Sequence, residues 1–320
     1  MIKIAVIGAG HMGEGHIRVY SRKPGVKLAA ICDPDEDRGR RLAKDYGAAW
    51  FADYRKVIPE IDAATIAVPT NLHHLVASEL LAAGKPVLLE KPISGTVKEG
   101  EELVRISRRK NVPLQIGHIE RFNPAVQRLA KELKTPRYLE IHRLGPFKGR
   151  GTEVSVVADL MIHDLDLVLD LVNSEIKEVS ALGLSAFTNS ADIATSRLVF
   201  ATGVVANLTA SRISDQSMRK IRVFESDKYW SLDCERQELV CYHKNQDESW
   251  RTKERPTLAD LMSREPVAVE KAEPLSLEID SFLKVVREGG KPVVTGDAGL
   301  AALKVALRID SLIKEGGEKW

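Results

Sequence analysis

The sequence is poor in the residues that several classes of protein require. It contains three cysteines in 320 residues, none in a C-x-x-C pair, so neither a disulfide framework nor a zinc motif is expected. Aromatic residues make up 5% of the chain, and the net charge is +2 with acids and bases interspersed. These values argue against nucleic acid as a partner, because its recognition needs stacking platforms or a basic surface.

Long apolar runs are missing as well. No apolar stretch reaches the roughly 20 residues that a bilayer-spanning helix needs, which argues against a membrane partner. The chain enters a strand-like run at Ile2, so we expect no signal peptide and a cytoplasmic location. No H-x-H or H-E-x-x-H spacing occurs, so no metal is expected.

The first third of the chain alternates between strand and helix patterns. Helical stretches, such as 72–83 and 97–110, separate aliphatic runs. The aliphatic runs are residues 2–7, 27–32, 63–68, 87–89 and 114–117. Aliphatic strands that alternate with helices predict a parallel sheet covered on both faces.

The pattern changes in the second part of the chain. Between residues 138 and 243, runs such as 197–200, 204–211 and 220–225 alternate with a two-residue period, and the turn at 201–203 suggests an antiparallel hairpin. The predicted fold class is α/β, with an N-terminal doubly wound Rossmann sheet and a C-terminal α+β domain whose open sheet is mainly antiparallel. We expect domains at 1–119 and 120–296, and a C-terminal helix at 297–320 that packs back on the first domain.

A glycine-rich motif follows the first strand. The segment Gly8-Ala9-Gly10-His11-Met12-Gly13 fits the G-x-G-x-x-G fingerprint, between an apolar strand and a helix-compatible stretch. The first glycine permits a tight turn, the second lets the backbone approach a pyrophosphate, and the third allows close helix–strand packing. The motif predicts a dinucleotide cofactor that contacts Gly8, Gly10, His11, Met12 and Gly13.

An acidic residue ends the second strand at the distance typical of this fingerprint. Asp33 lies 20 residues after Gly13, where a carboxylate can accept hydrogen bonds from the adenosine ribose. A carboxylate there also repels a 2′-phosphate, so NAD is the expected cofactor rather than NADP. Arg38, Arg40 and Arg41 could accommodate that phosphate, but we interpret them as an exposed helix face.

A later apolar stretch carries polar residues at helical spacing. Asp159, His163, Asp166 and Asp170 fall at i, i+4, i+7 and i+11 of a helix whose other positions, except Asp164, are aliphatic. Carboxylates beside an imidazole on a buried helix are costly unless they pair or line a wet cavity, and such a cavity can move protons. The alternative is a polar stripe that faces water.

A lysine follows the strand at 87–89 directly. Glu90-Lys91-Pro92 would emerge at the carboxyl end of the sheet, where open α/β sheets bind their ligands. Lys91 would then lie beside the nicotinamide end of the cofactor.

Four motifs occur in order along the chain: Gly8–Gly13, Pro69-Thr70-Asn71-Leu72-His73, Glu90-Lys91-Pro92, and Asp159 with His163 and Asp166. Together they resemble the glucose–fructose oxidoreductase and inositol dehydrogenase (Gfo/Idh/MocA) family over essentially the whole chain. The resemblance implies that Lys91 and His163 lie at the transferring carbon with Asp159 nearby, and that the Lys91-Pro92 peptide is cis. It also implies cofactor contacts from Pro69, His73, Glu90 and Lys91.

Oxidation of a secondary alcohol sends a hydride to the nicotinamide and a proton to a base. His163 can accept that proton at neutral pH, and Lys91 can hydrogen-bond the same oxygen or relay the proton. The sequence does not decide which of the two is the base. Asp159 would hold the imidazole in one tautomer or bind substrate.

The segment 117–125 (GHIERFNPA) resembles the branch of the family that acts on nucleotide-activated amino sugars. The resemblance implies that the protein oxidises the hydroxyl at C3 of UDP-N-acetylglucosamine. The alternatives are a dehydrogenase for a free sugar or inositol, and an NAD-binding sensor without turnover.

Arg212 is a candidate for a diphosphate contact, although a surface arginine is the simpler interpretation. The resemblance also implies a homodimer or homotetramer formed through the C-terminal sheet. The expected substrate contacts are His118, Arg121, Asn123, Asp159 and His163.

Overall fold

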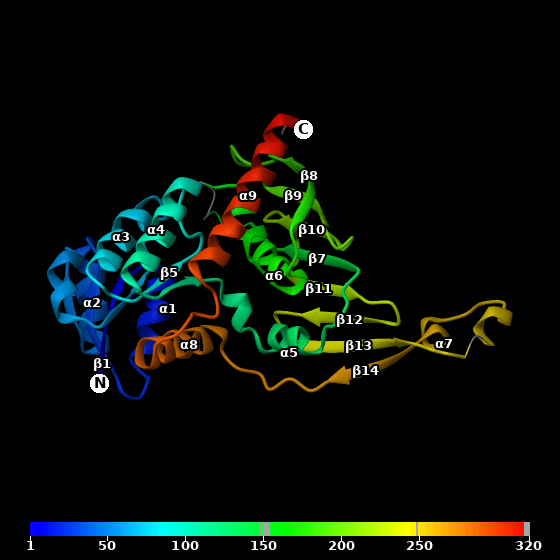
Figure 1. Cartoon of the computed structure of the whole chain (residues 1–320), viewed down its shortest axis with the longest axis horizontal. Helices are drawn as coiled ribbons and strands as arrows, with labels where there is room; N and C mark the ends of the chain where they lie inside the picture. The colour runs from blue at the N-terminus through cyan, green and yellow to red at the C-terminus, as the bar shows by residue number, and fades with distance from the viewer. Residues whose placement is uncertain (148, 150–153, 248, 317–320) are drawn as a thin grey trace. The chain divides into compact units, whose positions relative to one another are not determined.

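The structure is a computed structural model that describes residues 1–147, 149, 154–247 and 249–316. The chain divides into two compact units (Figure 1). Unit 1 contains residues 1–122 and 273–304, and unit 2 contains residues 123–272 and 305–320. Residues 273–296, which we expected in the second domain, group with unit 1, and the C-terminal helix is divided between the units.

Unit 1 is built on a six-stranded sheet with the order β3-β2-β1-β4-β5-β6, in which every pair is parallel. The strands are β1 (Ile2–Ile7), β2 (Val26–Cys32), β3 (Ala49–Phe51), β4 (Ala63–Ile66), β5 (Val87–Glu90) and β6 (Leu114–Gly117). The predicted strands and the parallel sheet are confirmed, and β3 was not predicted. Since the strand order reverses at β1 and β4, the loops that follow these two strands flank the crevice in which such sheets bind ligands.

The helices of unit 1 bury one apolar face each. They are α1 (His11–Tyr20), α2 (Glu36–Tyr46), η1 (Tyr54–Glu60), η2 (Thr70–Leu72), α3 (His73–Ala82), α4 (Val97–Lys110), η3 (Ile119–Phe122), α8 (Pro274–Glu288) and the start of α9 (Gly296–Gly316). Helix α3 packs on α4, and α8 packs on α1 and η3. Leu275, Ile279, Phe282 and Leu283 of α8 join the core around Ile17, which explains why this late segment belongs to unit 1.

Unit 2 is built on an eight-stranded sheet with the order β14-β13-β12-β11-β7-β10-β9-β8, antiparallel except for the β7–β10 pair. The strands are β7 (Tyr138–Leu144), β8 (Ile176–Leu184), β9 (Ile193–Phe200), β10 (Val205–Ser211), β11 (Met218–Phe224), β12 (Lys228–Asp233), β13 (Glu238–Lys244) and β14 (Met262–Val267). The predicted hairpin is confirmed, with Val199 opposite Val205. The mainly antiparallel second sheet is therefore confirmed as well.

The sheet of unit 2 is buried on one face. In β10, Ala206, Leu208 and Ala210 are buried while the residues between them are half-buried. The helical elements of this unit are α5 (Pro124–Glu132), the π-helix η4 (Val157–Met161), α6 (Ile162–Val172), η5 (Ser249–Thr252), α7 (Leu258–Leu261) and the end of α9. Among the described residues, no helix combines the length and apolarity that crossing a membrane requires.

Candidate active site

The three glycines of the loop after β1 differ in the space around them. A Cβ on Gly8, which has φ +92°, would lie 2.4 Å from the Ala67 carbonyl oxygen, and a Cβ on Gly13 would lie 1.9 Å from the Gly8 carbonyl oxygen. A Cβ on Gly10 would meet no described atom within 4 Å. Gly8 and Gly13 are thus required by the packing of the chain, whereas Gly10 leaves an open approach to the N-terminus of α1. That N-terminus has no side-chain cap and can bind an anion.

Asp33, which follows β2, is hydrogen-bonded to the backbone of the glycine loop. Its Oδ2 accepts the Ala9 N–H at 2.7 Å, and its Oδ1 accepts the Asp35 N–H at 2.9 Å and Nη2 of Arg38 at 2.7 Å. Burial opposes ionisation of Asp33, but the hydrogen bond from Arg38 and the two backbone N–H groups outweigh it and lower the pKa. Arg40 and Arg41 are exposed as expected, whereas Arg38 forms an ion pair with Asp33.

Lys91 follows the last residue of β5, and the Lys91-Pro92 peptide is cis, as the resemblance implied. The buried imidazole of His73 connects this segment to the end of β4. Its Nδ1 lies 2.7 Å from the Pro92 carbonyl oxygen, and its Nε2 lies 2.9 Å from the Val68 carbonyl oxygen. Burial lowers the pKa of His73 despite these two carbonyls, so the neutral ring donates to one of them at a time. His73 therefore braces the loops that carry Pro69 and Lys91.

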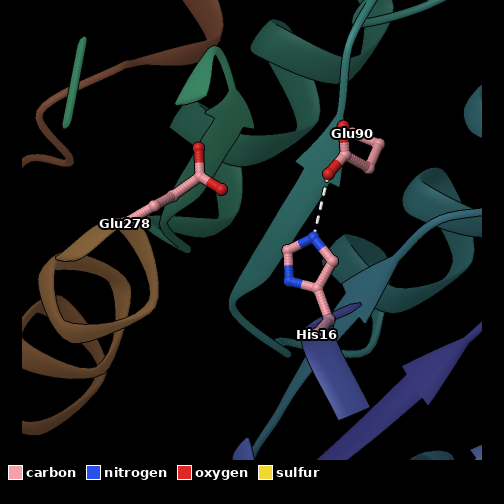
Figure 2. Close-up of side chains that lie close together, drawn as sticks. All are labelled: His16, Glu90 and Glu278. Carbon is pink, nitrogen blue, oxygen red and sulfur yellow. Dashed lines mark hydrogen bonds and ion pairs between the residues drawn. The ribbon is translucent and has the colours of Figure 1, made fainter. Parts of the chain in front are cut away.

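Glu90, which precedes Lys91, is held by a residue that the sequence did not suggest. Nε2 of His16 lies 2.8 Å from Oε1 of Glu90 (Figure 2). The Lys91 N–H donates to Oε2 at 3.3 Å. His16 and Glu90 are 74 positions apart, and neither belongs to a spacing motif with the other. Only the adjacency of β5 to helix α1 in the folded unit brings them together.

The predicted polar helix of unit 2 begins differently from our expectation. Asp159 lies in the π-helix η4, and His163 lies in the first turn of α6. Because a π-turn changes the angular spacing of its residues, the regular stripe that we inferred does not extend through Asp159. Asp159 and His163 are half-buried, Asp166 is buried and Asp170 is exposed.

Asp164, the acidic residue of the same helix that lies outside the predicted polar stripe, makes a buried ion pair. The Asp164 carboxylate accepts hydrogen bonds from Nε of Arg143 at 2.9 Å and from its Nη2 at 2.7 Å, so the pair is bidentate. Both side chains are almost fully buried, at 5% and 2% exposure. Arg143 anchors α6, and therefore His163, to strand β7. The sequence did not suggest this contact, since Arg143 belongs to no motif.

The segment that carries the remaining predicted substrate residues crosses from unit 1 to unit 2. His118 is buried, and Arg121 is half-buried on η3. The Asn123 amide caps α5 by accepting the Ala125 N–H at 3.1 Å and donates to the Cys234 carbonyl oxygen at 2.9 Å. These contacts give Asn123 a structural role within unit 2, and its contact with substrate stays a prediction.

Arg212 is not the surface arginine that we expected. It is 6% exposed, and its guanidinium donates to the Val154 carbonyl oxygen at 2.6 Å and the Ala191 carbonyl oxygen at 3.2 Å. These bonds link the segment before η4 to the loop before β9.

The parallel sheet, the open glycine loop, the carboxylate of Asp33 after β2 and the lysine at the end of β5 are the features expected of a nicotinamide-dinucleotide oxidoreductase. Residues 2–118 match the model of the oxidoreductase family with an NAD-binding Rossmann fold, and residues 137–229 match the GFO/IDH/MocA C-terminal domain. The chain belongs to the Gfo/Idh/MocA family of NAD-binding oxidoreductases.

Individual relatives extend the similarity over the whole length. UDP-N-acetylglucosamine 3-dehydrogenase of Acidithiobacillus ferrooxidans is 35% identical over 309 residues, which cover 96% of each chain. Its crystal structure superimposes with a TM-score of 0.91 and 34% identity over 98% of each chain. The scyllo-inositol 2-dehydrogenase (NAD(+)) of Bacillus subtilis is 25% identical, covering 98% of this chain and 95% of its own.

Proposed function

We propose that the protein oxidises C3 of UDP-N-acetylglucosamine to a ketone and reduces NAD. The observation that carries this proposal is the 35% identity to a UDP-N-acetylglucosamine 3-dehydrogenase over 96% of both chains. Lys91, His163 and Asp159 are all present, which supports turnover rather than a sensor that binds NAD without reacting.

NAD, when bound, accepts the hydride of the carbinol carbon. The substrate hydroxyl must lose its proton as the hydride leaves, so a basic group and a hydrogen-bond donor at that oxygen both lower the barrier. We assign these two tasks to the side chains of His163 and Lys91, with Asp159 as the orienting carboxylate. Either Lys91 or His163 can be the formal base.

The structural fit to the cofactor supports its assignment. Gly10 and the uncapped N-terminus of α1 would hold the pyrophosphate, and Asp33 would accept the ribose hydroxyls. His11, Met12, Pro69, His73 and Glu90 complete the proposed cofactor site. His118, Arg121 and Asn123 complete the proposed sugar site.

A second candidate function is the oxidation of a free sugar or inositol. The full-length similarity to a scyllo-inositol 2-dehydrogenase favours it, although the identity is lower, at 25%. The two candidates differ in where binding energy originates. With a UDP-sugar, the remote nucleotide supplies much of it, so removal of the nucleotide lowers kcat as well as affinity.

A substrate screen separates the candidates. Purified protein is incubated with NAD and a UDP-sugar, a free sugar or an inositol, in the presence of a reagent that traps ketones, because alcohol oxidation by NAD is uphill. We expect NADH formation with UDP-N-acetylglucosamine and a UDP-sugar product that is lighter by two hydrogens. Efficient oxidation of free inositol or glucose without a response to UDP-sugars would favour the second candidate instead.

We also propose a homodimer or homotetramer that forms through the half-buried face of the unit 2 sheet. A shallow hollow on this face is lined by Tyr138, Glu140, His142, Arg197 and Asn207 among others. Light scattering of the wild type and of Arg197→Glu tests this assembly, and a wild-type monomer would contradict it.

The three free cysteines are consistent with a reducing compartment, and we propose the cytoplasm.

A further inference from the structure

Three buried ionisable side chains meet inside unit 1 (Figure 2). His16 comes from α1, Glu90 from the end of β5 and Glu278 from α8. Their exposed fractions are 0%, 7% and 0%. Figure 2 shows the Glu278 carboxyl pointing towards the His16–Glu90 pair, which the hydrogen bond of 2.8 Å joins.

Glu278 is the unusual member of this group. Neither of its carboxyl oxygens has a hydrogen-bond partner among the described residues, and Nδ1 of His16 has none either. A buried carboxylate without a partner is very costly, so the group must be neutralised by a proton or by a cation.

A cation fits the geometry less well than a proton. The possible ligand atoms of the three residues lie within 4.8 Å of one another, whereas two metal–ligand bonds of about 2.1 Å span at most about 4.2 Å. Nε2 of His16 is also already engaged with Glu90. A proton on Glu278 requires no movement and leaves one negative charge, on Glu90, facing the His16 imidazole.

We propose that the cluster keeps Glu278 as a neutral acid and Glu90 as its single carboxylate, and that His16 positions Lys91 by fixing Glu90. The link is continuous: Nε2 of His16 hydrogen-bonds Oε1 of Glu90, and Oε2 accepts the Lys91 N–H. This inference rests on the proposed function, because it assumes that Lys91 takes part in the reaction.

The surroundings support this distribution of charge. Burial, and then the charge of Glu90, raise the pKa of Glu278 well above its ordinary value. Burial also opposes ionisation of Glu90, but the hydrogen bond and charge of His16, followed by the charge of Lys91, lower its pKa.

Besides His16, the buried titratable groups on the elements packed against α8 are Tyr20 and Glu120. The arginines of these elements, Arg18 and Arg121, are half-buried, and Arg18 pairs with Glu273. Helix α1 carries Tyr20, whose pKa burial raises, so it stays neutral. The buried Glu120 lies on η3. Neither adds a positive charge that would stabilise an ionised Glu278.

The first test measures the proton on Glu278 and needs no substrate. A neutral carboxylic acid gives its own carbonyl stretch in the infrared spectrum, separate from that of a carboxylate. We expect this band in the wild type at pH 7 and its loss in Glu278→Gln. Absence of the band from the wild type at pH 7 would overturn the proposal even if the variant failed to fold.

The pH dependence of unfolding gives an independent check. Since the folded-state pKa of Glu278 is raised, the native state keeps a proton that the unfolded state releases above about pH 4.3. From there to the folded-state pKa, the unfolding constant of the wild type should rise about tenfold per pH unit relative to Glu278→Gln. Parallel curves for the two proteins, or a stoichiometric metal ion in the purified wild type, would contradict the inference.

The second test addresses the positioning role of His16. His16→Leu removes the donor to Glu90, whereas His16→Gln keeps an N–H that can reach it. We expect His16→Leu to lower kcat at least about tenfold, because small displacements of a catalytic group are costly. The KM for NAD should change little, and the pH profile of kcat should shift, since Lys91 loses its fixed neighbour.

His16→Gln should recover most of the rate and restore the pH profile. Equal kinetics of His16→Leu and the wild type would overturn the positioning role. The kinetic assay uses whichever alcohol the substrate screen identifies, so a wrong sugar assignment does not affect this test. A protein without any dehydrogenase activity would contradict the proposed function, and the infrared result would still decide the protonation of Glu278.

Discussion

The two units place their functional groups by different means. In unit 1, the proposed ligand-binding elements are loops at the carboxyl ends of buried parallel strands, and short motifs mark them: the glycine loop after β1 and Lys91 after β5. In unit 2, the predicted functional groups lie on η4 and α6, and an ion pair between distant residues attaches α6 to the sheet. Cofactor recognition therefore depends on local backbone geometry, whereas the predicted proton chemistry of unit 2 depends on long-range contacts.

The largest expected effect concerns the residue that each unit contributes to catalysis. Lys91→Ala and His163→Ala should each lower kcat by about 10²–10⁴-fold, the usual contribution of a general acid or base. NAD affinity should stay near that of the wild type, because the pyrophosphate and ribose contacts lie elsewhere. Steady-state kinetics and calorimetric NAD titration check this. Near wild-type turnover in His163→Ala would remove unit 2 from the chemistry.

Breaking the buried ion pair of unit 2 should destabilise that unit. Arg143→Met removes both hydrogen bonds from Arg143 to the buried Asp164 carboxylate, and breaking such a buried pair typically costs about 3–5 kcal/mol. Chemical denaturation measures the loss. The double variant Arg143→Met/Asp164→Leu should recover much of it, since no isolated charge remains. A single variant as stable as the wild type would show that long-range pairing does not hold α6.

The glycine loop of unit 1 offers a matched pair of substitutions. Gly13→Ala should destabilise the protein by about 1–3 kcal/mol, as overpacking usually does, because its Cβ meets the Gly8 carbonyl oxygen. Gly10→Ala should leave stability unchanged or raise it by about 0.4–1 kcal/mol, and should weaken NAD binding. Thermal unfolding and NAD titration distinguish the two. A wild-type NAD affinity in Gly10→Ala would mean that the pyrophosphate binds elsewhere.

The smallest expected effect is on cofactor choice. Asp33→Asn removes the charge that opposes a 2′-phosphate, so the ratio of NADP to NAD affinity should rise about tenfold, equivalent to about 1.4 kcal/mol. An unchanged ratio would indicate that Arg38 already determines the preference.

The same substitution should change how the free energy of unfolding falls at acidic pH. The pKa of Asp33 is lowered in the folded state, so its contribution is present above about pH 4 and is lost as the pH falls through the folded-state value. Asp33→Asn should lack this acid-dependent loss. Acid denaturation followed by circular dichroism checks it.

The sequence predicted the features that depend on short stretches of chain. The strands of the first sheet, the glycine loop, the acid at Asp33 and the hairpin at 201–203 each have a local pattern that backbone geometry requires. It did not predict contacts between distant positions. His16 with Glu90, and Arg143 with Asp164, are paired only by the packing of elements.

The helix that contains His163 illustrates the same limit. Its apolar positions predicted α6, but the π-turn at Val157–Met161 carries no sequence signal that we recognised. Helix α8 likewise has an ordinary amphipathic pattern, and only its packing on α1 places it in unit 1.

The origin of the hydride tests the proposed function most sharply, because we propose that it leaves C3 of a UDP-linked N-acetylglucosamine. The substrate for this test is UDP-N-acetylglucosamine deuterated at C3, with NAD and a ketone-trapping reagent present. We expect deuterium at C4 of the reduced nicotinamide, and an initial rate lower than with unlabelled substrate when chemistry limits turnover. Reduced cofactor without deuterium would show that the hydride comes from another carbon, and no reduction of NAD would contradict the assigned substrate altogether.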